Sequence, residues 1–224
     1  MVETIGRDGV VRMLRGAVEK IRAGHETLSK LDSVIGDGDH GTTMVRAMGL
    51  VEKTVTACAA PDLQGLLHDV GWAVMGVDGG AAGPLLGSLL MGMAEGVGGR
   101  QQLDAAGLAA VFEAGLAQVR TYTQAQVGDK TMLDALVPAV EALRAAAQAG
   151  EGVAAAMARA ADAAEQGAAA TTDLQARFGR ARNLGQRSRG FADPGATSVS
   201  LIFRGFADAL APPDVQRKTN QPPA

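Results

Sequence analysis

The chain has 224 residues, of which 47% are hydrophobic and only 3% aromatic, a mixture that favours closely packed helices over broad sheets. Its formal charge is −3, with Lys and Arg scattered among Asp and Glu, which excludes the basic surface of a nucleic-acid-binding protein. The sequence has no signal pattern and no apolar run near the roughly 20 residues of a membrane span, and Cys58 has no disulfide partner, so we expect a cytoplasmic protein.

Three helices are expected in the first third of the chain. Hydrophobic residues recur at three- and four-residue spacing over residues 10–21, which predicts a first amphipathic helix. A second helix is expected over residues 42–55. A third is expected over residues 63–75, where Asp62 is suited to be the N-cap.

Five further helices are expected over residues 84–95, 103–122, 131–149, 153–170 and 197–210. Because no segment alternates between apolar and polar residues as strands require, we expect eight helices and no sheet. The simplest division is one all-helical domain over residues 1–210, followed by a proline-containing C-terminal tail over residues 211–224.

The densest chemical signal lies over residues 31–43, where three aspartates and three glycines share one loop. The glycines let the backbone turn tightly, so that Asp37 and Asp39 can face one point, which Asp32 reaches from the preceding helix end. Converging carboxylates repel one another unless cations lie between them, and hard oxygen ligands suit magnesium or calcium. The loop therefore predicts a metal site that also binds phosphate.

Two other motifs fit this loop less well. The glycine spacing matches the dinucleotide-binding fingerprint, but no strand pattern precedes it, and two aspartates would lie beside the pyrophosphate. An EF-hand requires a bidentate glutamate at its twelfth position, where this chain has Met48. An Asp- and Gly-rich turn without a metal stays open on composition alone.

A second glycine-rich loop, residues 76–84, opens onto a predicted helix, an arrangement that presents free amide hydrogens to an anion. It lacks the Lys-Ser/Thr ending of a P-loop, so by itself it equally fits a tight helix connection. The same holds for residues 128–132, where Thr131 fits a helix cap. In the polar segment that precedes the last helix, Arg180 is a candidate phosphate contact, although most exposed arginines are merely solvated.

Four motifs occupy residues 35–41, 79–84, 128–135 and 193–196, with Gly179-Arg180-Ala181 and Leu184-Gly185 before the last. Taken in order, they resemble the motifs of the dihydroxyacetone kinase L subunit. The resemblance covers nearly the whole chain. Four motifs in the family's order and spacing are far more specific than any one of them.

The resemblance implies a barrel of eight antiparallel helices with ADP or ATP and two magnesium ions at one end. Asp32, Asp37 and Asp39 match the ligands of the two ions. Residues that match nucleotide contacts are His40, Gly41, Thr42, Thr43, Ala81, Ala82, Met132, Arg180, Asp193, Pro194 and Gly195. Within this set Met132 corresponds to the residue against the adenine, and the last three to a loop that closes the pocket.

Two positions depart from the family pattern. Ala82 stands where the family usually has serine, so one hydroxyl contact to phosphate is absent, although a backbone amide there can still donate. Thr123 stands where a glycine is expected near the adenine. Both departures bear on nucleotide affinity.

The implied reaction transfers the terminal phosphoryl of magnesium-bound ATP to dihydroxyacetone or a four-carbon ketose such as erythrulose. No residue is expected to act as a nucleophile or acid-base catalyst, and the sugar-anchoring histidine of the family is missing, so a separate K subunit must hold the ketose. The donor is either exchangeable ATP or bound ADP that a phosphotransferase-system protein rephosphorylates. Association of two copies stays open.

Two alternative functions come from related proteins. One is the nucleotide-binding domain of fatty acid kinases, which work with a lipid-carrying partner and usually carry further domains. The other is a nucleotide-sensing regulatory subunit that binds a transcription factor. Identification of the partner protein separates both from a ketose kinase.

Overall fold

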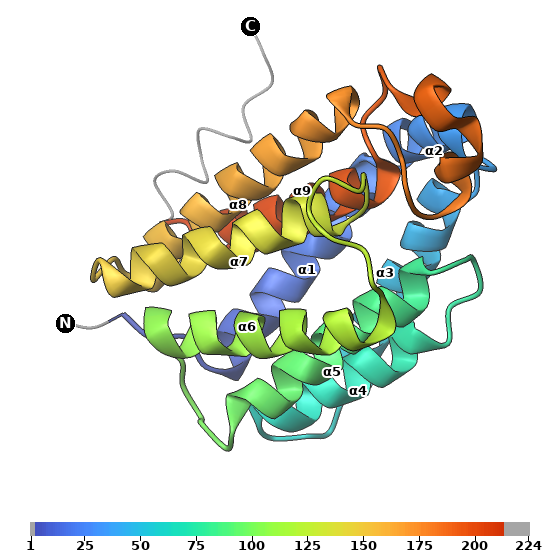
Figure 1. The fold of residues 1–224 in the computed structure, drawn as a ribbon. Helices are drawn as coiled ribbons and strands as arrows, with labels where there is room; N and C mark the ends of the chain where they lie inside the picture. Colours follow the sequence, from blue (N-terminus) through green and yellow to red (C-terminus); the bar gives the residue numbers. More distant parts are fainter. Residues whose placement is uncertain (1–2, 213–224) are drawn as a thin grey trace, which may run out of the picture.

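The structure is a computed structural model that describes residues 3–212, and within them it is all-helical (Figure 1). Its elements are α1 (Arg7–Ala23), α2 (His25–Ile35), α3 (His40–Ala57), α4 (Leu63–Met75), α5 (Ala82–Val97), α6 (Ala105–Tyr122), α7 (Leu133–Gln148), α8 (Val153–Ala170), the 3₁₀ helices η1 (Thr171–Asp173) and η2 (Arg180–Ser188), and α9 (Pro194–Leu210). The expected absence of a sheet is confirmed for these residues, where an isolated bridge between Ile5 and Leu103 is the one strand-like pairing. The tail expected over residues 211–224 lies, from residue 213 onward, outside the described residues.

The expected number of eight helices is wrong for the described part of the chain, which has nine α-helices. The additional helix is α2, which follows α1 after the single residue Gly24. Its sequence signal is weak because only Leu28 and Ile35 are buried among its 11 residues. The junction is close to α9, since a Cβ on Gly24 would lie 2.6 Å from the end of the Leu201 side chain.

The helices other than α2 form a closed ring. Each packs against the next along the chain, from α3 through to α9, and α1 closes the ring by packing against both α9 and α3. Figure 1 shows α7, α8 and α9 on one side of the molecule and α4, α5 and α6 on the other. Helix α2, η2 and the loop between α4 and α5 lie together at one end, on the right of that view.

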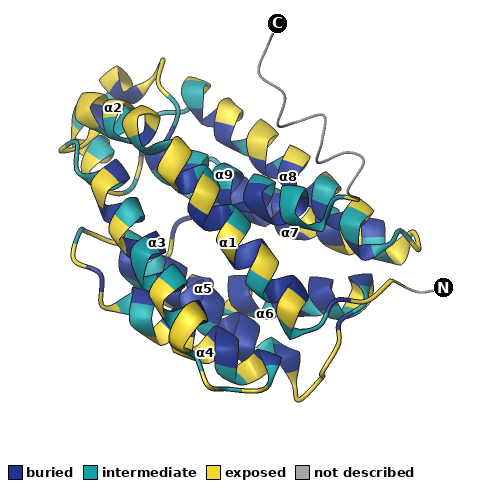
Figure 2. Ribbon diagram, turned by 180° about the vertical axis from the view of Figure 1, so that it is seen from behind, coloured by how far each residue is buried: buried dark blue, intermediate teal, exposed yellow. Residues whose placement is uncertain are grey.

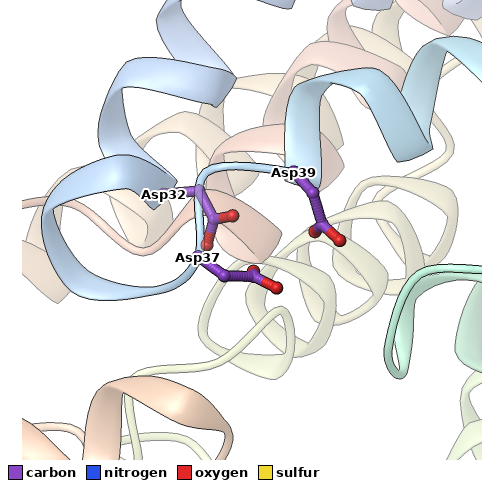
Figure 3. A group of neighbouring side chains, drawn as sticks. All are labelled: Asp32, Asp37 and Asp39. Atoms are coloured by element: carbon purple, nitrogen blue, oxygen red, sulfur yellow. The ribbon is translucent and has the colours of Figure 1, made fainter.

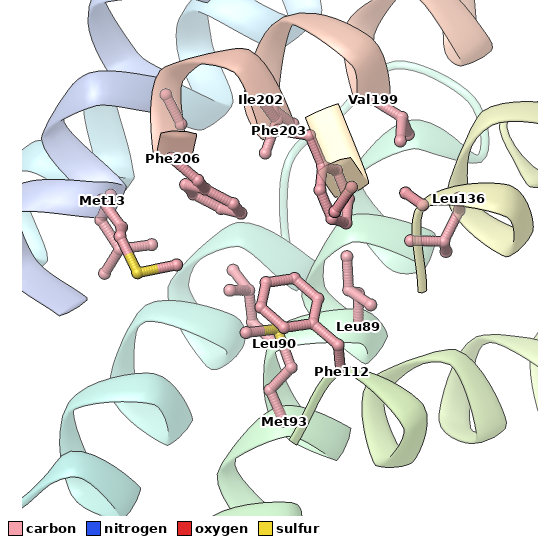
Figure 4. Packing of buried hydrophobic residues seen from close by; sticks show 14 of the residues in the cluster. Met13, Leu89, Leu90, Met93, Phe112, Leu136, Val199, Ile202, Phe203 and Phe206 are labelled. Atoms are coloured by element: carbon pink, nitrogen blue, oxygen red, sulfur yellow. The ribbon is translucent and has the colours of Figure 1, made fainter. Parts of the chain in front are cut away.

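Three phenylalanines fill the centre of the ring. Phe112 comes from α6, while Phe203 and Phe206 come from α9, three places away in the ring. Their ring centroids lie 5.2, 6.0 and 5.8 Å apart in tilted and edge-on arrangements (Figure 4). Although the sequence is poor in aromatic residues, three of its five phenylalanines lie together at the centre of the ring, where they fill the space between α6 and α9.

Elsewhere in the core the side chains are mostly aliphatic, and most helices have one buried and one exposed face, whereas α5 is buried over most of its length (Figure 2). The stripe predicted over residues 10–21 is confirmed, because its apolar members are buried on α1: Val10, Met13, Leu14, Ala17, Val18 and Ile21. The expected cap is confirmed too, since the Asp62 carboxylate accepts a 2.7 Å hydrogen bond from the amide of Gly65 at the start of α4.

Helices α1 and α9 touch backbone to backbone at Gly16 and Gly205. A Cβ on Gly16 would collide with the carbonyl oxygen of Gly205, and the reverse holds for a Cβ on Gly205. We expect Gly16→Ala to lower the free energy of unfolding by about 1–3 kcal/mol, because the two helices must separate. Gly49→Ala on α3 is the matched control: no atom lies within 4 Å of its added Cβ, so helix propensity predicts a gain of up to about 1 kcal/mol. Urea unfolding measures both, and equal effects would contradict the close approach.

Candidate functional site

The acidic loop joins α2 to α3. The backbone turns sharply after α2: the amide of Gly36 donates a 2.6 Å hydrogen bond to the carbonyl oxygen of Asp32, and Gly38 has the left-handed φ of +80°. The His40 amide then donates to the Asp32 carboxylate at 3.0 Å, which fixes that carboxylate at the start of α3.

This turn brings the three predicted metal ligands together. One carboxylate oxygen from each of Asp32, Asp37 and Asp39 lies within 4.8 Å of the others. Figure 3 shows the three side chains leaving neighbouring stretches of backbone, with their carboxylates gathered beside the loop. The predicted proximity of these residues is confirmed.

Arg180 reaches this cluster from η2, 143 residues further along the chain than Asp37. Its guanidinium forms an ion pair with the Asp37 carboxylate and lies 3.7 Å from that of Asp39. Both partners are well exposed, so the pairs add little to stability. These ion pairs show instead that the candidate phosphate contact, Arg180, lies in the same site as the candidate metal ligands.

The second glycine-rich loop lies beside the same cluster. Gly79 and Gly80 have positive φ values of 133° and 68°, and a Cβ on Gly79 would collide with the buried side chain of Thr43, in the first turn of α3. A Cβ on Gly80 would lie 4.0 Å from the Arg180 guanidinium. The loop thus passes between α3 and Arg180.

Two helices begin at this point of the molecule. Ala81 is the N-cap of α5 and Ala82 is its first residue; neither α5 nor α3 has a side-chain cap at its N-terminus within the described residues. The His40 amide of α3 is already bonded to Asp32, but the other amides of the two first turns remain as donors for an anion, with the positive ends of two helix dipoles behind them.

The residues at the start of α3 have different environments. His40 forms a 2.7 Å hydrogen bond through Nε2 with Ser198, whose hydroxyl also donates to the Pro194 carbonyl, so α3 is linked to the start of α9. Burial lowers the pKa of His40. Gly41 is buried against the His25 carbonyl, whereas Thr42 is exposed. The sequence did not indicate that Ser198 contacts His40, because the spacing of Ser198 on the last helix is that of an ordinary core position.

Met132 and residues 193–195 form a second group. Met132 is the N-cap of α7, and a Cβ on Gly195 would lie 3.5 Å from its Cβ. Asp193 caps α9, with its carboxylate accepting a 2.7 Å hydrogen bond from the Ala196 amide. Burial raises the pKa of Asp193 to about 7. Thr123 ends α6 in an extended conformation.

The expected site residues therefore form two groups that the His40–Ser198–Pro194 contacts connect. A surface hollow of about 420 Å³ lies elsewhere, where Asp62 and Arg100 are among its lining residues, and it contains none of the expected site residues. The acidic cluster has the donor set that a hard divalent cation prefers: several carboxylate oxygens on one open side of a loop, already attracting the cationic Arg180. The residues present thus fit magnesium.

Comparisons with known proteins agree on one family. Residues 34–208 match the DAK2 domain. The chain is 37% identical over 204 residues to the ADP-binding subunit DhaL of the PEP-dependent dihydroxyacetone kinase of Escherichia coli, an alignment that covers 91% of this chain and 97% of that protein. It is 36% identical over 203 residues to the corresponding subunit of kinase 1 of Listeria innocua, with 91% and 96% covered.

Longer proteins match over part of their length. The D-erythrulose kinase of Mycolicibacterium smegmatis is 36% identical over 210 residues, which cover 92% of this chain but 36% of that protein. The crystal structure of the dihydroxyacetone kinase from C. freundii in complex with AMP-PNP and Mg²⁺ superposes with a TM-score of 0.70 at 25% identity, covering 93% of this chain and 35% of that one. This chain thus spans about a third of each.

Proposed function

The chain belongs to the DAK2 domain family, and within it to the L subunits of dihydroxyacetone kinases, and from this membership we propose that it is the nucleotide-binding subunit of a small-ketose kinase. The observation that carries the proposal is the meeting of three carboxylates, Arg180 and the second glycine-rich loop at one place, from segments far apart in the sequence. Such a site suits a metal-bound polyphosphate.

Asp32, Asp37 and Asp39 are the proposed ligands of two magnesium ions. Bound magnesium would neutralise the charge of the terminal phosphates. The chain's own contribution is to hold those phosphates: amides at the start of α5, and those of α3 after His40, donate hydrogen bonds to them, and Arg180 supplies a fixed positive charge. This assigns the phosphates to His40–Thr43, Ala81 and Ala82.

The base of the nucleotide is proposed to lie against Met132, with the turn of Asp193, Pro194 and Gly195 closing the pocket. A Cβ on Gly195 would lie only 3.5 Å from the Cβ of Met132, which supports this assignment because the two segments can form adjoining walls of one pocket. The closed ring of helices is the proposed eight-helix barrel, within a domain over residues 1–210, with the nucleotide at the end where α2 and η2 lie.

The phosphoryl acceptor is proposed to be dihydroxyacetone or an erythrulose-like ketose held by a K subunit. The relatives named above are dihydroxyacetone kinase subunits and an erythrulose kinase, which favours this function over a transcription-factor-binding subunit or a fatty acid kinase-like domain. Relatives named as PEP-dependent and PTS-dependent support bound ADP that a phosphotransferase-system protein rephosphorylates.

Within the described residues, no helix combines the length and hydrophobicity that crossing a membrane requires.

Calorimetric titration tests the binding half of this proposal. Because the carboxylates and the nucleotide phosphates repel one another without a cation between them, ADP should bind in the presence of magnesium and lose most of its affinity when EDTA removes the metal. Binding of equal strength with and without magnesium would show that the acidic loop does not serve the nucleotide.

A further inference from the structure

Lys130 is an unusual lysine in two respects. Its side chain is only 1% exposed, which places it among the largest fully buried side chains of the protein. Its φ is +62°, and it is the one non-glycine residue with a positive φ in the part of the chain that the structure describes. A buried ammonium and a left-handed lysine are both unfavourable in isolation, so the surrounding structure must hold this residue in place.

The Lys130 ammonium is held by two backbone carbonyls. It donates hydrogen bonds to the carbonyl oxygens of Thr171 and Phe191, which flank the segment that contains η2. Burial lowers the pKa of Lys130, and the nearby carboxylates of Asp193, Asp134 and Asp173 act in the opposite direction. Because its side chain is buried and two of its three donors are engaged inside the protein, Lys130 does not serve as a surface contact for phosphate.

These bonds lead directly to the turn before α9. Thr171, whose carbonyl Lys130 contacts, uses its hydroxyl to accept a 2.8 Å hydrogen bond from the amide of Asp193 and to donate to the carbonyl of Ala168. The Phe191 carbonyl lies two residues before Asp193 in the same turn. Lys130 and Thr171 therefore anchor the turn to the end of α8.

The backbone of Lys130 belongs to the adjoining wall of the same site, because Met132 follows two residues later. Met132 lies against Gly195, within the turn that Lys130 anchors. We propose that Lys130 is a positioning residue that sets the spacing of the two walls of the nucleotide-base site, an inference that rests on the function proposed above. It acts through Thr171 and Phe191 and does not touch the nucleotide.

The test separates base binding from phosphate binding. The variant Lys130→Met keeps a side chain of similar length at the same left-handed backbone position but removes the ammonium group. Its affinities for magnesium-ADP and for magnesium-tripolyphosphate, which has no base, are measured calorimetrically on the full chain. We expect about tenfold weaker ADP binding with tripolyphosphate affinity changed by less than about twofold. The exposed Lys53→Met on α3 is the control and should match the wild type in both.

A second pair of variants covers the case in which Lys130→Met does not fold. Thr171→Val removes the hydroxyl that holds Asp193 and should show the same selective loss, whereas Thr171→Ser retains the hydroxyl and should restore ADP affinity. Wild-type ADP affinity in Lys130→Met or Thr171→Val, or a parallel loss of tripolyphosphate binding, would overturn the inference. Failure of the wild type to bind ADP would instead reject the proposed function itself.

Discussion

Asp37→Asn should abolish the magnesium-dependent stabilisation of this protein by ADP while leaving its helix content unchanged. A ligand at about 100 times its dissociation constant adds about 2.7 kcal/mol to the free energy of unfolding, which for a domain of this size raises the melting temperature by about 5–11 °C. The Asn side chain keeps the shape of Asp37 but removes the charge of an exposed proposed ligand, so we expect the fold to be preserved and the shift to be lost. Thermal melts with ADP, with and without magnesium, measure the effect.

The matched control is Asp69→Asn on α4, another exposed aspartate that lies outside the acidic cluster. It should keep the full magnesium-dependent shift. If Asp37→Asn also kept the full shift, the assignment of the acidic loop to the metal would be wrong.

The second large effect is the near absence of ketose phosphorylation by this chain alone. Each expected site residue is proposed to serve metal, phosphate or base, and none is proposed to anchor the carbonyl of a sugar. A ketose in free solution would have to meet the nucleotide in a bimolecular encounter, without the orientation that bound substrates have, and that orientation represents about 7–11 kcal/mol of barrier. Purified protein with magnesium-ATP and dihydroxyacetone or erythrulose should therefore form almost no product in a coupled assay.

Asp37→Asn purified in the same way reveals contaminating kinases, because a contaminant gives equal traces of product in both preparations. Strong ketose phosphorylation by the wild type, absent from this variant, would show that the chain has an acceptor site of its own.

Much of the fold could be predicted because each ring helix carries a long apolar stripe or a clear boundary residue. The pattern over residues 10–21 and the cap at Asp62 needed only local information, and both are confirmed. Helix α2 could not be separated from its neighbour, because its 11 residues bury only two side chains. Its junction at Gly24 lies beside Leu201 of α9, a neighbour far away in the sequence.

The site was predictable where its residues are neighbours in sequence and not where the fold brings them together. Asp37 and Asp39 share a loop whose glycines already indicate a tight turn. The pairing of Arg180 with Asp37 spans 143 residues and follows from the packing of η2 beside α2, which no local pattern predicts. Lys130 lies in a motif noted from the sequence, but its left-handed backbone and its burial appear only in the structure.

The central claim is that this chain supplies the nucleotide site to a kinase whose acceptor site lies on a partner. The direct measurement is ketose phosphorylation after mixing the purified chain with its cognate K subunit, using ATP and, separately, a phosphotransferase-system donor with bound ADP. The account predicts that product forms only when both subunits are present, and that Asp37→Asn in this chain stops its formation. Equal product formation with this chain omitted, or none from the two wild-type subunits with either donor, would contradict it.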